Sequence, residues 1–450
     1  MSQNHLQELA VGVVKRALDA GATDAECTIA EGDEFSANVR MRELENLKEA
    51  GSRGAGLRIL IGKKTGASST SDLSSAGIAY LVKSAIELAD VTNDDPHAGL
   101  PEVEELGTLA SDLRLCSPDV LQLETELKIA TARRAEEAAL SADPRISNSE
   151  GASFDTQTGR RIFANSRGFA GEYSTSYCGL SVVPVAREDD SMERDYWDTS
   201  ARGFAGLEAP EKIGQIAAQR ALRRLHPVKV ETQKVPVVFE ARVARSLVGE
   251  IFDAVHGMAV YRHQSFLAGK LGEKVASEAI TVIDDGTIPG LFGTSPFDDE
   301  GVPSRRTVVI EKGVLKSYLL NCYAARKLGM KTTGNASRGL TGNAGIGHGN
   351  FYLEKGTATP EQIIGGIRNG FYVTQVVGFG VNIVTGDYSQ GASGLWIRDG
   401  ELAFAVSEVT IAANLKDMLL GLEAVGSDLE FRGSVATPTV KIGEMTVGGK

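Results

Sequence analysis

Apolar residues near the start of the chain recur at three- and four-residue intervals, at Leu6, Leu9, Val13, Val14, Ala17 and Leu18. This spacing predicts an amphipathic helix, and Gly21 marks its end because glycine favours the position after a helix. A second stripe follows Asp72 and predicts another helix, with its apolar face formed by Ile78, Leu81, Val82, Ala85 and Leu88.

The chain between these two helices alternates short apolar stretches with turn residues. Such a pattern is typical of antiparallel strands. We expect strands at residues 26–30, 35–41, 45–49, 56–61 and 65–69. The opening of the chain is therefore predicted to be a helix, a meander and a helix that covers the meander.

A connection rich in Pro, Gly and acidic residues, from 93 to about 111, leads to a predicted helix at 119–141. Hairpin strands at 160–165, 171–177 and 179–186 follow, and then a helix at 211–225. Prolines and a polar linker interrupt the pattern at residues 226–236, which is typical of a domain boundary. We therefore expect two domains, residues 1–228 and residues 229–450.

The second half is richer in short strands, predicted at 235–239, 279–283, 307–311 and 314–319. Helices at 359–369 and 414–422 are expected to pack on them. Because strands and helices are grouped apart, we predict an α+β fold rather than a doubly wound parallel sheet. The N-terminal domain is the helix–meander–helix unit, and the C-terminal domain is β-rich and mixed.

Composition narrows the class of protein. The 450 residues are 42% hydrophobic and carry a formal charge of −12, which disfavours direct nucleic-acid binding. The run Arg220, Arg223, Arg224, His226 and Lys229 is interpreted as a solvated helix end rather than a phosphate site.

The first residues lack the apolar core of a signal peptide, and no stretch reaches about 18 apolar residues. We expect a cytoplasmic protein.

The four cysteines, Cys27, Cys116, Cys178 and Cys322, are far apart and are expected to be buried free thiols. Cys322 precedes a predicted helix, whose N-terminus could activate a thiol, but a structural role is favoured. There is no GxSxG motif, and the glycines at 378–382 do not complete a phosphate loop. A metal-independent hydrolase is therefore disfavoured, since no nucleophile with an adjacent base is recognisable.

A zinc hydrolase needs His or acidic ligands and a Glu that accepts a proton from the bound water. No histidine in this chain is followed by Glu. His256 and His263 are the only neighbouring pair, and Gly257 argues against one helix carrying both. The sequence thus predicts no metal site in this chain.

Three polar clusters are candidates for binding. Residues 296–301 include Asp298, Asp299 and Glu300, which suit either a cation site or an ordinary turn, and the turn is favoured. Residues 333–338 and 385–391 combine glycine with hydrogen-bonding side chains and suit either a peptide groove or surface hairpins. The expected substrate-facing residues are Asp299, Asn335, Asn382, Asp387 and Tyr388.

The second half resembles the TldD/PmbA family, named as modulators of DNA gyrase, over more than 180 residues. The blocks that carry this resemblance occur in the family's order: AVYRHQSFLAGKLGEKVA from Ala259, TSPFDDEG from Thr294, VVIEKGVLKSYLLNCYAARKLGMKTTGNA from Val308, GDYSQGASGLWIRDGE from Gly386 and SEVTIAANLKDMLLGLEAVGSD from Ser407. The N-terminal half matches more loosely.

The resemblance implies that an HExxxH zinc motif of the TldD branch would align with Val248, Gly249 and Asp253. These residues cannot supply that motif, so the chain resembles the PmbA branch, also called TldE. We then expect a noncatalytic subunit that pairs with a zinc-holding TldD-type chain. The pair would enclose unfolded or modified peptides, and the TldD-type chain would cleave them. A homodimer is expected for the isolated chain. The alternative is a regulatory binding protein, of the gyrase-modulator type, without proteolysis.

Overall fold

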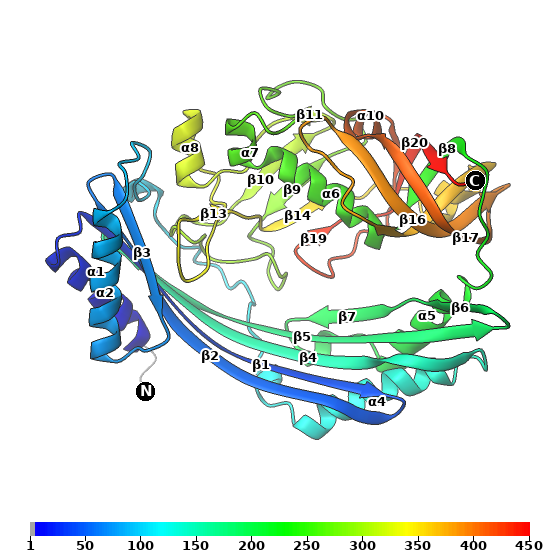
Figure 1. Cartoon of the computed structure of the whole chain (residues 1–450), viewed down its shortest axis with the longest axis horizontal. Coiled ribbons are helices and arrows are strands. Elements are labelled where there is room, and N and C mark those ends of the chain that lie inside the picture. The colour runs from blue at the N-terminus through cyan, green and yellow to red at the C-terminus, as the bar shows by residue number, and fades with distance from the viewer. Residues whose placement is uncertain (1–4) are drawn as a thin grey trace.

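The computed structural model describes residues 5–450 of the chain. Figure 1 shows two layers: a long, curved sheet formed by the first half of the chain, and a body formed by the second half that lies over the inner face of that sheet. Helices cover the outer face of the sheet. The prediction of an α+β fold is confirmed.

The first two helices form where the apolar spacing predicts them. Helix α1 spans His5–Asp19, and its buried residues are Ala10, Val13, Val14 and Ala17. Helix α2 spans Ser75–Asp90. The side-chain oxygen of Ser74 accepts a hydrogen bond from the Gly77 N–H, which satisfies one free donor at the start of α2.

The strands between α1 and α2 are fewer and longer than predicted. They are β1 (Asp24–Arg40), β2 (Glu43–Ile61) and β3 (Lys64–Thr70), so the expectation of five short strands was wrong. Gly32, between the strands expected at 26–30 and 35–41, lies inside β1 and pairs with Ser52 of β2 and with Gly159. A Cβ atom at Gly32 would lie 2.4 Å from the Thr158 carbonyl oxygen, so glycine permits the close approach of the neighbouring strand.

The hairpins that follow extend the same sheet. Its strand order is β3-β2-β1-β4-β5-β6, and β7 also pairs with β5. The added strands are β4 (Ile146–Asn165), β5 (Ala170–Glu188), β6 (Ser191–Arg194) and β7 (Trp197–Ala201). The helix expected at 119–141 is divided into α3 (Pro118–Leu121) and α4 (Thr125–Leu140), and α5 spans Pro210–Leu222. Short 3-10 turns occupy Val103–Glu105 and Phe204–Gly206.

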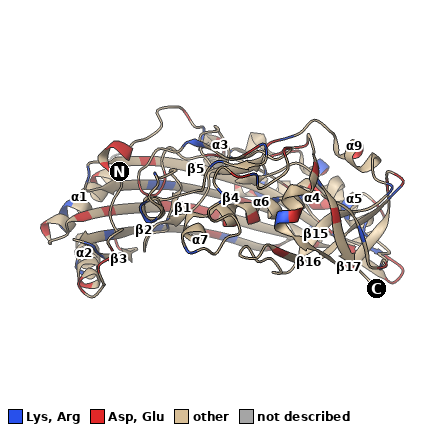
Figure 2. Cartoon of the chain, turned by 90° about the horizontal axis from the view of Figure 1, so that it is seen from above, with Lys and Arg blue, Asp and Glu red and all other residues tan. Residues whose placement is uncertain are grey.

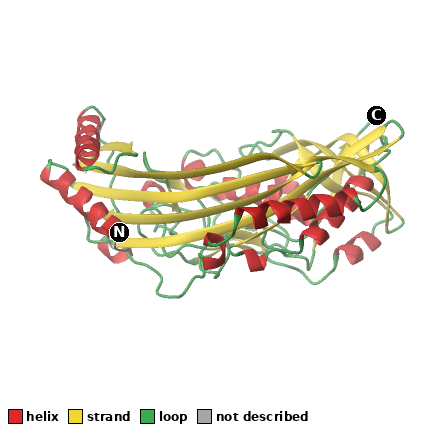
Figure 3. Ribbon diagram, turned by 90° about the horizontal axis from the view of Figure 1, so that it is seen from below, coloured by secondary structure: helices red, strands yellow, loops and turns green. Residues whose placement is uncertain are grey.

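Side chains alternate across the seven-stranded sheet. On β1, Ala25, Cys27 and Ile29 are buried against α1 and α2 on the outer face. Helices α4 and α5 pack on the outer face towards the other end, as Figure 3 shows from below. Glu26 and Thr28 point the opposite way and contact Arg338 from the second half. Around these residues the sheet is thus buried on both faces, whereas residues 43–53 of β2 are exposed.

The second half contains three sheets. Their strand orders are β17-β16-β15-β8-β20-β18, β11-β10-β9-β14-β19 and β12-β13. The strands are β8 (Gln233–Phe239), β9 (Val282–Asp285), β10 (Arg306–Glu311), β11 (Val314–Leu315), β12 (Ala336–Ser337), β13 (Gly345–Ile346), β14 (Asn350–Leu353), β15 (Asn369–Val377), β16 (Asp387–Arg398), β17 (Glu401–Asn414), β18 (Leu422–Val425), β19 (Val435–Ala436) and β20 (Val440–Gly448). The helices are α6 (Ala241–Val255), α7 (Gly257–Tyr261), α8 (Cys322–Leu328), α9 (Pro360–Gly365) and α10 (Leu415–Leu420).

Several predicted elements in this half are shorter than expected. Of the strand expected at 314–319, only Val314–Leu315 (β11) forms. The helix expected at 359–369 forms only as α9, Pro360–Gly365, because strand β15 begins at Asn369. The strand expected at 279–283 starts at Val282 instead. Irregular segments that pair through isolated bridges, such as Lys274 with Val314, fill the space between them.

The interpretation of the basic run at 220–229 as a solvated helix end was wrong for Arg220 and Arg224, whereas His226 and Lys229 are exposed. Arg220 is buried and pairs with Asp195 and Glu240, while Arg224 lies beside Glu193. The carboxylates neutralise the arginines and tie α5 to the neighbouring strands. Figure 2 shows acidic and basic segments interspersed over the chain.

Of the four cysteines, Cys27, Cys178 and Cys322 are buried and Cys116 is exposed, so the expectation of four buried thiols was wrong at Cys116. Burial raises the pKa of Cys322 far above its usual value, and the nearby Glu300 carboxylate adds to this rise. Cys322 is therefore a protonated structural thiol. Among residues 5–450, no helix has the length and the apolar run that crossing a bilayer requires.

Candidate functional site

Helix α6 carries the positions that align with the zinc motif. Its apolar residues fall on one stripe, Val243, Ala244, Leu247, Val248, Ile251, Ala254 and Val255, and this stripe enters the main core of the second half. The helix ends at His256, whose backbone is extended, just before Gly257. The opposite side of α6 carries its polar residues.

The three aligned positions face different surroundings. Val248 is 2% exposed and lies in the core. Gly249 is partly exposed, and no atom lies within 4 Å of the place where its Cβ would be. Asp253 is exposed to solvent. The helix therefore directs position 248 inwards and position 253 outwards, and these side chains do not converge.

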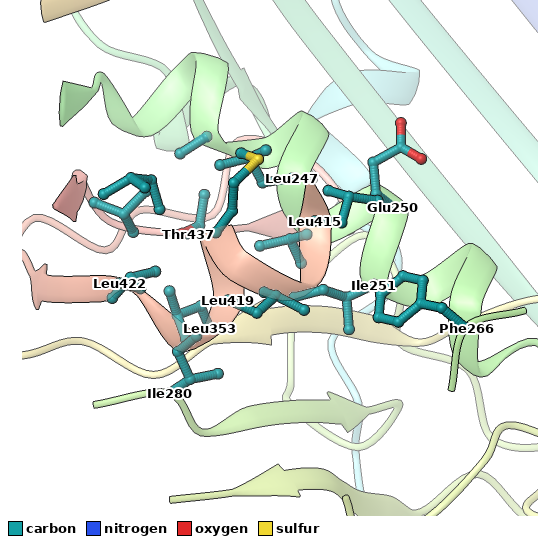
Figure 4. Close-up of a pocket in the computed structure, with 15 residues that line it drawn as sticks. Leu247, Glu250, Ile251, Phe266, Ile280, Leu353, Leu415, Leu419, Leu422 and Thr437 are labelled. Atoms are coloured by element: carbon teal, nitrogen blue, oxygen red, sulfur yellow. The ribbon is translucent and has the colours of Figure 1, made fainter. Parts of the chain in front are cut away.

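A small apolar cavity of about 30 Å³ lies beside Val248. Aliphatic residues of α6, α10, β18 and β20 line it together with Phe266 and Leu353, as Figure 4 shows. Glu250 stands at the edge with its carboxylate directed away from the cluster. An apolar cavity of this kind stays dry and offers neither a metal ligand nor a proton acceptor.

The acidic groups of α6 have raised pKa values. Burial raises the pKa of Glu250, and the neighbouring Asp253 carboxylate raises it further. Although Asp253 is exposed at the helix surface, partial desolvation by the surrounding protein also raises its pKa, whereas His256 and His348 oppose that rise. Both imidazoles pack edge-on against the Phe252 ring, at centroid distances of 5.9 Å and 4.8 Å.

These groups do not form a metal site. Across residues 5–450, no group of three or more His, Cys, Asp or Glu side chains is placed to hold a metal ion. His256 lies between α6 and α7, and His263 lies beyond α7, so the pair does not share one helix.

A polar cavity of about 320 Å³ lies between the two layers. The seven-stranded sheet and its following loop contribute Tyr173, Thr175 and Arg202. The second half contributes Asp284, Asp298, Asp299, Asn335 and His348 among others. Because both halves supply its walls, we treat this central cavity as the candidate binding site.

Two of the five predicted substrate-facing residues, Asp299 and Asn335, line the central cavity. Asp299 lies 2.8 Å from the Arg161 guanidinium and accepts a hydrogen bond from the Arg338 N–H at 2.7 Å. Asn335 donates through Nδ2 to Asp284 at 2.7 Å and accepts from the Thr333 hydroxyl at 2.7 Å. Both side chains are held rigidly by these contacts.

The other three predicted residues lie elsewhere, near the β15–β16 connection. Asn382 accepts hydrogen bonds from the Val384 and Thr385 N–H groups, and Asp387 accepts one from the Thr385 hydroxyl at 2.7 Å. Tyr388 is buried, and its hydroxyl has no hydrogen-bond partner among the described residues. This group stabilises a loop and is separate from the central cavity.

The acidic turn at 296–301 closes one side of the central cavity. Asp298 is buried and accepts hydrogen bonds from the N–H groups of Glu300, Val302 and Ala336 at 2.9–3.0 Å. Glu300 accepts one from the Cys322 N–H at 2.9 Å. Burial raises the pKa of both carboxyls. The turn interpretation fits these contacts, since the carboxyl oxygens bind main-chain donors.

Sequence reasoning missed Asp284 and Arg202. Asp284 follows the apolar stretch of β9, and an acidic residue at the end of a buried strand is the signal that could have found it. Burial raises the pKa of Asp284 to about 7. Arg202 binds the carbonyl oxygens of Ser176, Leu291 and Phe292 across the two halves. No local pattern around Arg202 indicates that role.

Models of the PmbA/TldA metallopeptidase family match most of the chain. Its domain 1 matches residues 25–89, its central domain residues 118–225 and its C-terminal domain residues 232–449. The chain is 36% identical to the metalloprotease PmbA of Escherichia coli O157:H7 over 449 residues, covering 100% of this chain and 97% of that protein. A PmbA homologue of Haemophilus influenzae is 34% identical, with 99% and 97% covered.

This chain belongs to the PmbA/TldD family, in its PmbA (TldE) branch. Among solved structures, a candidate modulator of DNA gyrase from Bacteroides thetaiotaomicron superposes with a TM-score of 0.92 at 27% identity, covering 100% of both chains. TldE from Thermococcus kodakarensis superposes with a TM-score of 0.86 at 22% identity, covering 98% of this chain and 100% of that one.

Proposed function

We propose that this chain is the noncatalytic subunit of a TldD/TldE-type zinc metalloprotease in the cytoplasm. Its partner is a TldD-type chain that holds zinc in an HExxxH motif and cleaves unfolded or modified peptides. This chain forms part of the wall that encloses the substrate. The family membership supports the general activity, and the residues of α6 support the division of labour.

One observation carries the proposal: Val248 is packed in the aliphatic core while Asp253 is on the outer side of α6. Valine and glycine have no group that ligates zinc or accepts a proton from a metal-bound water. Residues 248, 249 and 253 would therefore need different side chains, and side chains that point towards one another, to act as a zinc site. Glu250 and Asp253 neighbour each other, but no group of three or more ligands that could hold a metal forms around them among residues 5–450.

The central cavity fits a binding role. Asp299, Asn335 and Arg202 have most of their hydrogen bonds within the protein, so they form a preorganised polar wall rather than a reactive group. A rigid wall of this kind can orient a peptide without chemistry of its own. The catalytic step would belong to the other subunit.

The test is coexpression with a TldD-type chain from the same genome. We expect the two chains to copurify as a stoichiometric complex, and we expect zinc to follow the TldD-type chain. A chain that remains alone or only pairs with a second copy of itself under these conditions would count against the proposal.

The second candidate function is a regulatory binding protein without proteolysis, favoured by the description of the Bacteroides thetaiotaomicron structure as a candidate gyrase modulator. The two functions differ in what happens to a peptide when both subunits are present. A protease cleaves the peptide, and cleavage stops when a zinc chelator is added. A regulatory protein binds the peptide without cleaving it.

A further inference from the structure

A second cleft, of about 990 Å³, lies between one end of the seven-stranded sheet and the six-stranded sheet. It shares no lining residue with the central cavity. Strand β6 contributes Met192 and Arg194, the first turns of α6 contribute Arg242 and Ser246, and β15 contributes Gln375 and Val376. Neither the family match nor the names of the relatives assigns a role to this cleft.

Two strand edges border this cleft. Within the described chain, β6 pairs only with β5, so its other edge has no strand partner. Strand β15 pairs with β8 only from Phe371 to Val373, and from there to Val377 its one strand partner is β16. Open edges of this kind offer main-chain donors and acceptors to an added strand.

Arg224 holds the two edges together. Its guanidinium donates to the Gln375 side chain of β15 at 2.8 Å and lies 3.4 Å from the Glu193 carboxylate of β6. The free stretch of β15, four residues from Thr374 to Val377, spans about 13 Å at the usual strand rise. The cleft therefore suits a short extended segment.

Arg242 supplies a polar anchor in the wall of the cleft. Its side chain is 10% exposed and pairs with Asp198 through Nη2. Its guanidinium carbon lies 4.3 Å from the Trp197 ring centre and 4.9 Å from that of Tyr196. The Nη1 atom is buried and has no hydrogen-bond partner among the described residues. A buried donor without an acceptor is unfavourable, so an incoming acceptor would satisfy it.

The charge around this anchor favours an anion. The cleft is lined by the four arginines 40, 194, 224 and 242 and by the three acids Glu150, Glu193 and Asp195, an excess of one positive charge among the lining residues (4 − 3 = 1). Asp198 pairs with Nη2 of Arg242 and leaves Nη1 as the free donor. Arg242 also lies in the first turn of α6, where the helix dipole favours negative charge. The carboxylate of Glu240, the residue before the helix, binds Arg220 and does not cap α6.

We propose that this cleft binds an extended peptide by its free C-terminal carboxylate, with the main chain along the β15 edge and the carboxylate at Arg242. The inference extends the proposed function by giving this subunit a peptide site of its own. It does not require the zinc-bearing partner, so it is measured on the isolated chain. Tyr196, which is 45% exposed, shifts to admit the carboxylate.

The experiment uses an unstructured peptide without acidic side chains, labelled at its N-terminus, in a free-acid form and a C-terminal amide form. Fluorescence anisotropy with the full chain measures both affinities. We expect the acid to bind roughly tenfold or more tightly than the amide, as for one charge-assisted hydrogen-bonded contact. Equal affinity of the two forms, or no binding of either, overturns the proposal.

Two variants locate the site. Arg242→Lys keeps the charge but loses the planar donor pair, so we expect it to lose most of the preference for the acid. Ser246→Phe fills the cleft from the exposed side of α6 and is expected to weaken both forms, while Ser75→Phe, exposed at the start of α2, is the matched control and leaves binding unchanged. If Ser246→Phe, with an unchanged melting temperature, binds as well as the control, the proposal is wrong.

Discussion

A buried ionic triad of Glu26, Arg58 and Arg338 joins the two layers. Glu26 on β1 is fully buried, and its Oε1 atom accepts hydrogen bonds from Arg58 at 2.8 Å and from Arg338 of the second half. Burial alone would raise the pKa of Glu26, but the two guanidinium groups lower it overall. The triad is therefore ionised, and each member depends on the others.

Replacing Glu26 should be strongly destabilising. In Glu26→Gln, two buried guanidinium groups lose their counter-charge, and breaking a buried ion pair costs about 3–5 kcal/mol. Urea denaturation measures the free energy of unfolding. Glu87→Gln removes an exposed partner of Lys83 and serves as the control, which should unfold like the wild type. Equal stability of both variants would show that the triad does not join the layers.

Asp284 should make stability depend on pH. Its pKa rises from 3.8 to about 7 on folding, chiefly by burial, so the folded chain holds a proton that the unfolded chain releases. Stability from this group is fully present below pH 3.8 and is lost as pH rises towards about 7.

The Asp284→Asn variant has no carboxyl group to titrate at this position. Between pH 5 and pH 8 the wild type should lose about 1–3 kcal/mol of unfolding free energy relative to Asp284→Asn. Urea denaturation at the two pH values measures that difference. A constant difference across the range would contradict the assigned pKa.

At the scale of elements, helices were easier to predict than strands. The apolar stripe of α1 determines its burial directly, and the observed helix matches the pattern. Strand β1 was divided in the prediction into segments at 26–30 and 35–41, with Gly32 between them. Pairing with Ser52 on β2, and with Gly159 on β4 more than a hundred residues away, shows that the strand continues.

The candidate site was predictable only in part, because residue types in loops are local information and the placement of the two layers is not. Asp299 and Asn335 lie in loops whose residue types indicate polar contacts, and both line the central cavity. Arg202 comes from the other half of the chain, and its role depends on how the two layers are placed. Periodicity carries no information about that placement.

The cavity beside α6 offers a test of how this helix packs. Val248→Ile adds one methylene towards a void of about 30 Å³ and keeps the β-branched shape. We expect it to be neutral or to stabilise the fold by up to about 1 kcal/mol, because burying a methylene contributes about 0.8 kcal/mol. Thermal unfolding measures the change. Val248→Asp should unfold the chain, and an Asp variant as stable as wild type would place this residue outside the core.

At the scale of the whole molecule, three arginines surround Trp197 where the layers meet. Arg220, Arg242 and Arg432 lie 4.3–5.1 Å from its ring centre. Arg432, from the loop before β19, also pairs with Glu208 at 2.9 Å. This joint links β7, α6 and the C-terminal part of the chain.

Removing Arg432 should loosen the joint. Arg432→Ala leaves Glu208 without that partner and exposes the Trp197 ring, so we expect a loss of about 1–3 kcal/mol in unfolding free energy. Arg368→Ala, at an exposed pair with Asp399, is the control and should change little. Chemical denaturation followed by Trp fluorescence compares the two. Equal effects would mean that the joint contributes no more than a surface ion pair.

We propose that this chain belongs to a metalloprotease complex but does not itself hold the catalytic metal. Zinc analysis of the purified chain, combined with hydrolysis of an unfolded peptide by the chain alone and by its complex with a TldD-type partner, tests this most directly. We predict no stoichiometric zinc and no cleavage by the chain alone, and chelator-sensitive cleavage by the complex. Stoichiometric zinc and cleavage by the isolated chain, both lost on replacing Asp253 or His256, would contradict the claim.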